Sequence, residues 1–135
     1  MSATCVLDTD VVIAALDRGD AHHRAAARAL RRMAATETNL LLCTVNYAEA
    51  LVRPAEDEDN LRTAIAAISA LQLRLISPSP TVARDAARKR SLGISLADGF
   101  ALATAAAHKA SVASFDKRVR RALRAAGLRL SPALG

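Results

Sequence analysis

Short apolar runs alternate along this chain with longer segments that favour helix, and this alternation limits the accessible folds more than any other feature. The predicted strands are residues 4–7, 39–43, 73–76 and 111–114, with a short fifth strand at 128–130. The predicted helices are residues 11–16, 21–35, 44–52, 60–70, 78–90, 95–109 and 117–126. Strands separated by helices are typical of a parallel sheet whose crossovers cover both faces. We therefore expect an α/β fold with a central, mainly parallel sheet of four or five short strands and helices on both faces.

The length of 135 residues suits one compact domain, because domains cluster near roughly 100 to 150 residues. A single domain over residues 1–135 is therefore expected. Cys5 and Cys43 lie in apolar runs without metal-ligand spacing, where a free thiol behaves as a small hydrophobe. Free thiols indicate a reducing compartment, which points to the cytoplasm. No apolar run approaches the roughly 18 residues that a bilayer-spanning helix needs, so no membrane partner is expected.

The net charge of +6 is concentrated at one end of the sequence. Residues 117–135 contain six basic residues and no acid, whereas the 13 basic and 13 acidic residues before them cancel. A basic end of this kind indicates an anionic partner such as nucleic acid. The candidate RNA contacts are Lys117, Arg120, Arg121 and Arg124 in the last predicted helix, and Arg88, Lys89 and Arg90 at the end of an earlier one. For both groups the alternative is an ordinary solvated surface, and basic residues favour a helix C-terminus in any case.

Four acidic residues are predicted to lie at the carboxyl edge of the sheet, where open parallel sheets place their chemistry. They are Asp8 and Asp116, which follow predicted strands, Glu49, in a helix that leaves a strand, and Asp98, in the first turn of a helix that leads to one. Each has a structural alternative, because aspartates cap helices and Ser95 with Asp98 has the spacing of a capping box. Glu49 lies in a mostly apolar stretch, where a buried carboxylate without a partner would be costly.

Four carboxylates at one sheet edge would repel one another and raise their pKa values unless a cation lay between them. An all-oxygen set of this kind suits Mg²⁺, or Mn²⁺ in its place. Such a cation activates water and stabilises charge on phosphorus, which matches the hydrolysis of phosphodiesters. The acids and the basic end together predict a metal-dependent nuclease.

The residues that carry this predicted site also resemble those of PIN-domain ribonucleases, and more narrowly those of the VapC toxins of bacterial toxin–antitoxin pairs. The matching pieces are residues 6–13, Thr44 five residues before Glu49, residues 95–98 and residues 114–116. The resemblance implies that Asp8, Glu49, Asp98 and Asp116 surround Mg²⁺, with Asp8 and Asp98 foremost as direct ligands, and that Thr9, Thr44 and Ser114 orient them by hydrogen bonding. Two positions depart from the family pattern: Gly99 stands where many relatives have Ala, and Ser114 where many have Thr.

The resemblance further implies a Mg²⁺-dependent endoribonuclease toxin that forms a homodimer, acts on RNA and is neutralised by a cognate VapB-type antitoxin blocking the acidic site. A receiver-type phospho-signalling domain also places acids after its first strand. It requires an Asp after the third strand and a Lys after the fifth, where this chain has Ser77 and Ser131. A noncatalytic interaction module with the same fold stays open as an alternative. His22, His23 and His108 lack the spacing of metal ligands and are expected to be surface or capping residues.

Overall fold

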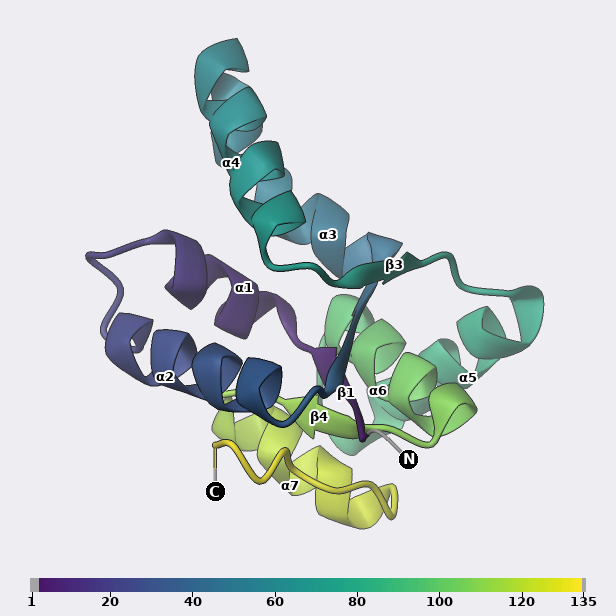
Figure 1. Cartoon of the computed structure of the whole chain (residues 1–135). Coiled ribbons are helices and arrows are strands. Elements are labelled where there is room, and N and C mark those ends of the chain that lie inside the picture. Colours follow the sequence, from purple (N-terminus) through teal and green to yellow (C-terminus); the bar gives the residue numbers. More distant parts are fainter. Residues whose placement is uncertain (1–2, 135) are drawn as a thin grey trace.

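Four parallel strands form the sheet of the computed structural model, which describes residues 3–134 (Figure 1). The strands are β1 (Thr4–Leu7), β2 (Asn39–Cys43), β3 (Arg74–Ile76) and β4 (Ser111–Ala113). Their order across the sheet is β3-β2-β1-β4, and every pairing is parallel. In the central strand β1, Val6 pairs with Leu41 on one side and with Val112 on the other. The predicted α/β class and mainly parallel sheet are confirmed.

Residues 128–130 do not form the predicted fifth strand and contribute one isolated bridge, between Leu130 and Val112. The Ser131 N–H donates to the Val112 carbonyl oxygen beside this bridge (2.7 Å). Gly127, with a φ of 71°, turns the chain just before the segment. A proline, which has no N–H to donate, follows Ser131. The prediction of a fifth strand is therefore wrong, because only Leu130 of this segment pairs with the sheet.

Seven α-helices connect and follow the strands within residues 3–134. They are α1 (Thr9–Leu16), α2 (His23–Ala35), α3 (Thr44–Leu51), α4 (Glu58–Ala70), α5 (Pro80–Lys89), α6 (Leu96–His108) and α7 (Lys117–Ala125). Short 3₁₀ turns at Pro54–Glu56 and Arg90–Leu92 precede α4 and α6. The helix α4 begins two residues earlier than predicted, because Asp57 caps it by accepting the Asp59 N–H (3.0 Å). In this described part of the chain, no helix combines the length and the apolar character needed to cross a membrane.

Other predicted helix starts also differ from the structure by one or two residues: α1 begins at Thr9, α5 at Pro80 and α6 at Leu96. The helix α2 begins at His23, two residues later than predicted, because the Asp20 side chain accepts the His22 N–H (2.8 Å) and holds the chain in a turn. The helix α3 begins at Thr44, as predicted, and Cys43 occupies the capping position without a side-chain hydrogen bond.

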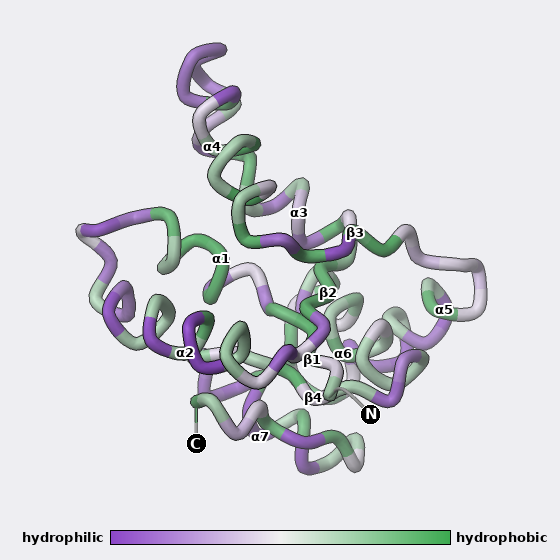
Figure 2. The backbone as a smooth tube through the Cα atoms, in the orientation of Figure 1, coloured by the Kyte–Doolittle hydropathy of each residue, from purple (hydrophilic) through white to green (hydrophobic). Residues whose placement is uncertain are grey.

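Two apolar cores lie on the two faces of the sheet, because successive strand residues point to opposite faces. Cys5 and Leu7 of β1 face the core that α1 and α2 cover, whereas Val6 faces the core under α6 and α7 (Figure 1). The first core contains Cys5, Leu7, Val11, Val12, Ala14, Ala26, Ala29, Met33, Leu42, Ala50, Ile68 and Ala113. The second contains Val6, Leu41, Ile94, Ala101, Leu102, Ala105, Ala110, Val112, Val119, Ala122 and Leu123. Figure 2 shows β2 as hydrophobic and the far end of α4 as hydrophilic. Burial of each large aliphatic side chain stabilises the fold by about 1.5–3 kcal/mol. Helices cover both faces of the sheet, as predicted.

The helices α5 and α6 approach each other so closely that Gly99 has no room for a side chain. A Cβ atom on Gly99 would lie 2.6 Å from the carbonyl oxygen of Ala86, a backbone atom of α5. This contact is the reason that glycine stands at this position of the chain. Because Asp98 immediately precedes Gly99, the same contact sets where the first turn of α6 lies.

Gly99→Ala is expected to destabilise the protein by about 1–3 kcal/mol, the usual cost of overpacking. The added methyl group would meet backbone, which no side-chain rotation can relieve, and this outweighs the gain of up to about 1 kcal/mol in helix propensity. Chemical unfolding followed by circular dichroism measures the change. Gly19→Ala is the matched control, because its Cβ would meet only the Asp17 side chain, at 3.3 Å. A Gly99→Ala protein as stable as the unmodified chain would contradict the close contact.

Candidate active site

The strands β1 and β4 lie side by side where the strand order reverses, since the chain runs from β1 to β2 and β3 on one side and then crosses to β4 on the other. Side chains at the carboxyl ends of two such strands face a common crevice. Asp8 follows β1 and Ser114 follows β4, and the Ser114 hydroxyl donates to Asp8 Oδ2 (2.8 Å). The Asp8 N–H also donates to the Ala113 carbonyl oxygen (2.9 Å). This pair is the centre of the candidate site.

Asp8 is almost fully buried, with 2% of its surface exposed. It caps α1, and its Oδ1 accepts the Thr9 N–H (2.9 Å). Burial disfavours the charged carboxylate, and the charges of Asp10 and Asp98 add to this effect, so the pKa of Asp8 is raised to about 7. The hydrogen bonds from Ser114 and Thr9 act in the opposite direction. Asp8 therefore exchanges a proton near neutral pH, where a carboxylate is ordinarily fully charged.

Sequence reasoning did not select Asp10, which the structure places in the same cluster. Its Oδ2 accepts the Phe115 N–H (2.9 Å) and lies 3.5 Å from Ser114 Oγ. Its Oδ1 is buried and has no hydrogen-bond partner within residues 3–134. Burial raises the pKa of Asp10, the Phe115 N–H opposes the rise and the charge of Asp116 adds to it. The sequence feature that could have identified Asp10 is its position two residues after Asp8, in the first turn of the helix that follows a buried strand.

Asp116 caps α7, and Asp98 takes part in the capping box of α6, at this edge of the sheet. Asp98 forms a reciprocal capping box with Ser95: the Ser95 N–H donates to Asp98 Oδ2 (3.3 Å), and the Asp98 N–H donates to Ser95 Oγ (3.1 Å). Asp116 Oδ1 accepts the Arg118 N–H (2.7 Å), and the Asp116 N–H donates to Ser114 Oγ (3.2 Å). Both residues therefore have the helix-capping role that was the structural alternative to a catalytic one. The same caps hold the carboxylates near the end of β4 and the start of α6.

Asn46 of α3 connects three elements of the site, and sequence reasoning did not select it either. Its Nδ2 donates to Thr9 Oγ1 (3.0 Å) and to the Ala97 carbonyl oxygen (3.1 Å), which joins the starts of α1 and α6. Asn46 is completely buried, and its Oδ1 has no partner in the described chain. The sequence feature that could have identified Asn46 is a polar amide in a largely apolar helix. Thr9 is thereby linked to Asn46 through its side chain and to Asp8 through its N–H.

Glu49 and Thr44 do not join these hydrogen bonds. Glu49 is exposed on α3, so the expectation that its apolar neighbours in sequence would bury it is wrong, and its carboxylate needs no partner. Thr44 is partly buried at the start of the same helix. Glu49 was predicted from its position after the second strand and from the family resemblance, and Thr44 from the resemblance alone; in this structure neither forms a hydrogen bond with Asp8 or Ser114.

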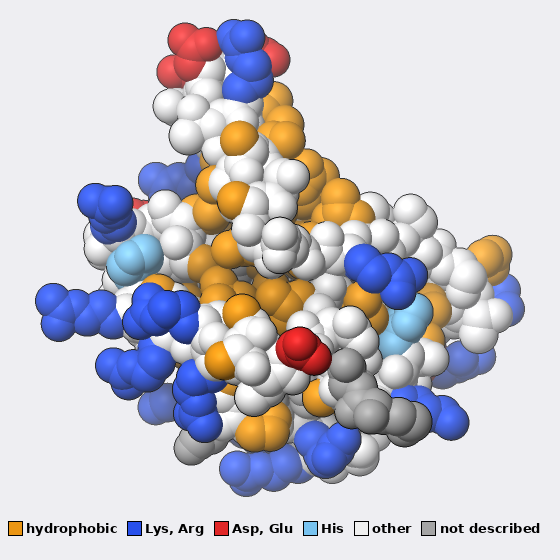
Figure 3. All heavy atoms as spheres, viewed as in Figure 1, with side chains coloured by type: hydrophobic (Ala, Val, Ile, Leu, Met, Phe, Trp, Pro, Cys, Tyr) orange, Lys and Arg blue, Asp and Glu red, His pale blue; other side chains and the backbone are white. Residues whose placement is uncertain are grey.

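Glu49 instead lines an apolar groove of about 780 Å³ between α1, α3 and α4. Its lining combines the apolar residues Ile13, Leu16, Ala50, Val52, Pro54, Ala64 and Ala67 with the charged residues Asp17, Glu49 and Arg53. Figure 3 shows hydrophobic surface in the hollow below the projecting α4. The Val52 side chain is 64% exposed there. The groove therefore offers an apolar surface with two acidic groups and one basic group on its wall.

The basic residues predicted to contact RNA differ in how firmly they are held. Lys89 forms an ion pair with Asp85 (3.2 Å), and Arg90 donates to a backbone oxygen of the following loop. Arg120 Nε donates to the carbonyl oxygen of Ser114 (2.8 Å), the residue whose hydroxyl binds Asp8. The exposed members are Arg88, Arg90, Lys117, Arg121 and Arg124. Arg120 is thus the predicted basic residue that the structure ties most directly to the site.

The donor set of the cluster suits a hard divalent cation. Within residues 3–134, no three His, Cys, Asp or Glu side chains lie close enough together to share one metal ion in the present arrangement. Mg²⁺ keeps several water ligands and binds proteins through one or two carboxylates, so a cage of three residues is not required. The buried Asp8 carboxylate and the unpartnered Asp10 Oδ1 are oxygen donors of that kind. A cation beside them would also offset the burial and repulsion that raise both pKa values.

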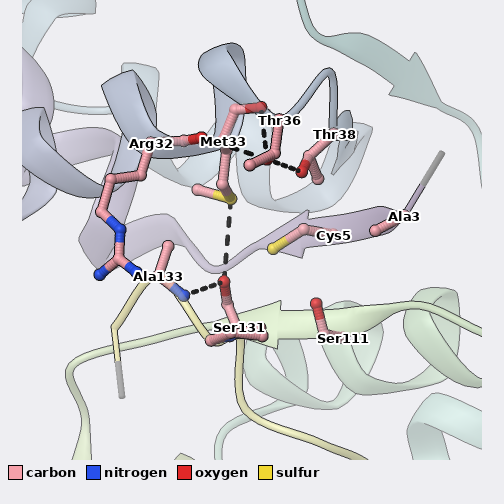
Figure 4. A pocket seen from close by; sticks show the side chains of 10 residues that line it. Ala3, Cys5, Arg32, Met33, Thr36, Thr38, Ser111, Ser131 and Ala133 are labelled. Atoms are coloured by element: carbon pink, nitrogen blue, oxygen red, sulfur yellow. Dashed lines mark hydrogen bonds between the residues drawn. The ribbon is translucent and has the colours of Figure 1, made fainter.

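A second cavity, of about 210 Å³, lies at the opposite, amino-terminal edge of the sheet (Figure 4). Cys5, Ser111 and Ser131 line it, and the Ser131 hydroxyl donates to the Met33 sulfur (3.8 Å). Burial raises the pKa of the Cys5 thiol, and both Cys5 and Cys43 are free and buried, as expected. The cavity contains none of the carboxylates, so it is separate from the candidate site.

Comparisons with known proteins add a family and a set of similar folds. The sequence profile of the PIN domain matches residues 5–124, and no curated protein sequence matches the chain. FitAcB from Neisseria gonorrhoeae is 21% identical over 96% of this chain and 97% of that chain, with a TM-score of 0.71. VapBC2 from Rickettsia felis, solved with a fragment of its promoter DNA, is 15% identical over 95% and 97%, with a TM-score of 0.73. VapC20 from Mycobacterium tuberculosis, described as a toxin that cleaves the sarcin–ricin loop, is 18% identical over 92% and 95%, with a TM-score of 0.70. At these identities the likeness establishes the fold.

Proposed function

The chain belongs to the PIN domain family, and from this premise we propose that it is a Mg²⁺-dependent endoribonuclease. The observation that carries the proposal is the buried Asp8 carboxylate, whose pKa is raised to about 7 by burial and by the charges of Asp10 and Asp98. A carboxylate in such surroundings costs stability, and strongly perturbed acids gather at functional sites. A bound cation would offset that cost, which explains why the fold retains the carboxylate.

The proposed roles follow from the contacts of each side chain. Asp8 and Asp10 would hold the cation, with Asp98 and Asp116 completing its surroundings from the starts of α6 and α7. When bound, Mg²⁺, or Mn²⁺ in its place, lowers the pKa of water and stabilises charge on the phosphoryl group. Ser114 fixes the orientation of Asp8 by donating to Oδ2. Glu49 and Thr44 keep the roles that the family resemblance implies, as predictions only.

RNA is the proposed substrate because positive charge adjoins the carboxylates. The basic helix α7 begins immediately after Asp116. Arg120 is anchored through Nε to the Ser114 carbonyl oxygen, and its other N–H groups are suited to a phosphate oxygen. Lys117, Arg121 and Arg124 are exposed on the same helix. These side chains would bind the RNA backbone that the acidic cluster alone would repel.

We further propose that the enzyme is the toxin of a toxin–antitoxin pair. The support is the VapC-like sequence pattern together with the fold shared with VapBC2 and FitAcB. The groove between α1, α3 and α4 suits an amphipathic segment of the antitoxin, and Asp17 and Glu49 on its wall favour basic residues of that segment. The same likeness to VapC proteins motivates the proposals that the protein is cytoplasmic and that it forms a homodimer. Light scattering would test the homodimer.

Incubation of the purified protein with single-stranded and structured RNA tests the proposed activity. We expect internal cleavage in Mg²⁺ or Mn²⁺ and none after a chelator is added, because no cation is then present to activate water and stabilise charge on the phosphoryl group. Cleavage that persists in the chelator would contradict the metal-dependent mechanism. Binding of RNA without cleavage in either metal would instead favour the noncatalytic interaction module.

A further inference from the structure

The His22 ring stacks on the Phe115 ring at the edge of the carboxylate cluster. The ring centroids are 4.4 Å apart and the planes differ by 7°. The Phe115 N–H donates to Asp10 Oδ2 (2.9 Å), so the stacked pair is joined directly to the cluster. The His22 side chain is 55% exposed, so much of it stays accessible to solvent while the ring stacks on Phe115. Sequence reasoning had expected His22 to be an ordinary surface or capping residue.

A row of arginines on α2 begins next to this stacked pair. Arg24, Arg28 and Arg31 are spaced by four and three residues, which places them on one face of the helix. All three are exposed. The opposite face packs into the core through Ala26, Ala29 and Met33. The helix contains no acidic residue, and none of the ion pairs within residues 3–134 involves its arginines.

Residues 1–116 have a net charge of zero. That sum does not reveal the arginine row of α2, because many of the balancing acids lie elsewhere on the surface. Four of the balancing acids, Glu56, Asp57, Glu58 and Asp59, are exposed at the far end of α4. Figure 3 shows acidic side chains at the top of the molecule, at the end of α4 where Asp59 pairs with Arg62, and several basic side chains below, over the region of α2 in Figure 1. The helix α2 therefore presents a positive surface that the sum over the sequence hides.

We propose that α2 and His22 form an RNA-binding track that leads to the carboxylate site. Arg24, Arg28 and Arg31 bind backbone phosphates, and His22 stacks on a nucleobase beside the phosphodiester that is cut. The inference rests on the proposed ribonuclease function and adds a second RNA-binding surface to the one proposed on α7.

The geometry favours single-stranded RNA on this track. The 13 residues of α2 span about 20 Å, and the helix runs from the carboxyl edge of the sheet, at His22, to its amino-terminal edge. Arginine forms two hydrogen bonds with one phosphate, which suits it to a row of backbone contacts. Aromatic rings, including that of histidine, stack on bases that are free of pairing. A base held in a duplex could not reach His22.

The test measures the binding of a fluorescein-labelled single-stranded RNA by anisotropy, in chelator, over a series of salt concentrations. The track variant combines Arg24→Gln, Arg28→Gln and Arg31→Gln. The control combines Arg62→Gln, Arg74→Gln and Arg84→Gln, three exposed arginines of α4, β3 and α5. Each phosphate contact contributes about 0.7 to the magnitude of the slope of log affinity against log salt concentration. With three contacts removed, the slope of the track variant should be smaller in magnitude by about 2. The control, with the same change in net charge, should keep the original slope.

His22 has its own test, which separates stacking from a merely structural role. We expect His22→Ala to weaken RNA binding by about tenfold, the scale of one stacked base, and His22→Phe to restore it because the flat ring returns. Circular dichroism of each variant confirms that the exposed substitutions leave the fold intact. Loss of binding in His22→Phe equal to that in His22→Ala would overturn the stacking role.

Three further outcomes are decisive. If the unmodified chain binds and cleaves RNA while the track variant keeps its salt slope, or while the control loses as much, the track is overturned and the ribonuclease stands. If the unmodified chain neither binds nor cleaves RNA in any of these conditions, the proposed function fails and the track fails with it. If the track variant changes the oligomeric state in light scattering but leaves RNA binding intact, α2 is a protein interface and the track is overturned.

Discussion

Asp8→Asn is expected to reduce metal-dependent RNA cleavage by at least about 10²-fold, since even residues that only orient metal ligands cost up to about that factor. Asparagine keeps an oxygen that can accept the Thr9 N–H and preserves the shape of the side chain. It removes the negative charge on which the cation depends. Initial rates on one RNA, with Mg²⁺ in excess, measure the loss. Glu58→Gln, an exposed charge removal in α4, is the matched control and should leave the rate unchanged.

The same assay distinguishes Asp10 from Glu49. Asp10 has a buried oxygen without a partner beside Ser114, whereas Glu49 is exposed on α3. We therefore expect Asp10→Asn to lower the cleavage rate more than Glu49→Gln. Full activity in Asp8→Asn would refute the mechanism. The reverse order of the two other variants would show that the side chain of Glu49 reaches the metal in the working enzyme.

Without metal, the protein is expected to lose stability as the pH rises from about 4 to about 7. The pKa of Asp8 is 3.8 in the unfolded chain and about 7 in the folded one. Below the lower value both states hold the proton, so the contribution of the group to stability is fully present. Between the two values the unfolded chain has released the proton that the folded chain keeps, and the free energy of unfolding falls until the pH exceeds the folded value. The difference is on the order of 4 kcal/mol at about 1.4 kcal/mol for each pKa unit. Asp10 acts in the same direction, because its pKa is also raised.

Urea unfolding in chelator at about pH 5 and about pH 8 measures this dependence. Asp8→Asn removes the titrating group, so the variant should lose less stability than the unmodified chain over the same interval. Adding Mg²⁺ should stabilise the unmodified chain more at the higher pH, because the cation binds the charged carboxylate, and this gain should be small in the variant. Equal pH dependence in the two proteins would contradict the raised pKa of Asp8.

Asp8, Asp98 and Asp116 could be selected from the sequence because each stands next to a predictable boundary. Asp8 and Asp116 follow strands, and Asp98 completes a capping box. Caps depend on a few neighbouring residues, so local sequence suffices to place them. The helix starts that were wrong, such as those of α2 and α4, differ by only one or two residues, which is the ordinary uncertainty of helix ends.

Asp10 and Asn46 could not be recognised with the same ease, because their roles depend on distant partners. Asp10 bonds to the Phe115 N–H, and Asn46 bonds to Thr9 and to the Ala97 carbonyl oxygen. These contacts join residues far apart along the chain. Local sequence has a signal for each residue, an acid in a first turn and an amide in an apolar helix, but that signal does not identify the partner.

The sequence by itself determined the class of fold, the places of the strands and the edge at which the acids gather, because hydrophobic patterning and helix caps act over short range. Only the tertiary structure decided that β4 lies beside β1, so that Ser114 meets Asp8. It also decided which carboxylates lose contact with water, and burial is the first cause of the raised pKa values of Asp8 and Asp10. Tertiary packing also brings His22 onto Phe115. It likewise separates the acids at the end of α4 from the arginines of α2. Strand order and burial come from packing both faces of the sheet at once, which no local segment of the sequence specifies.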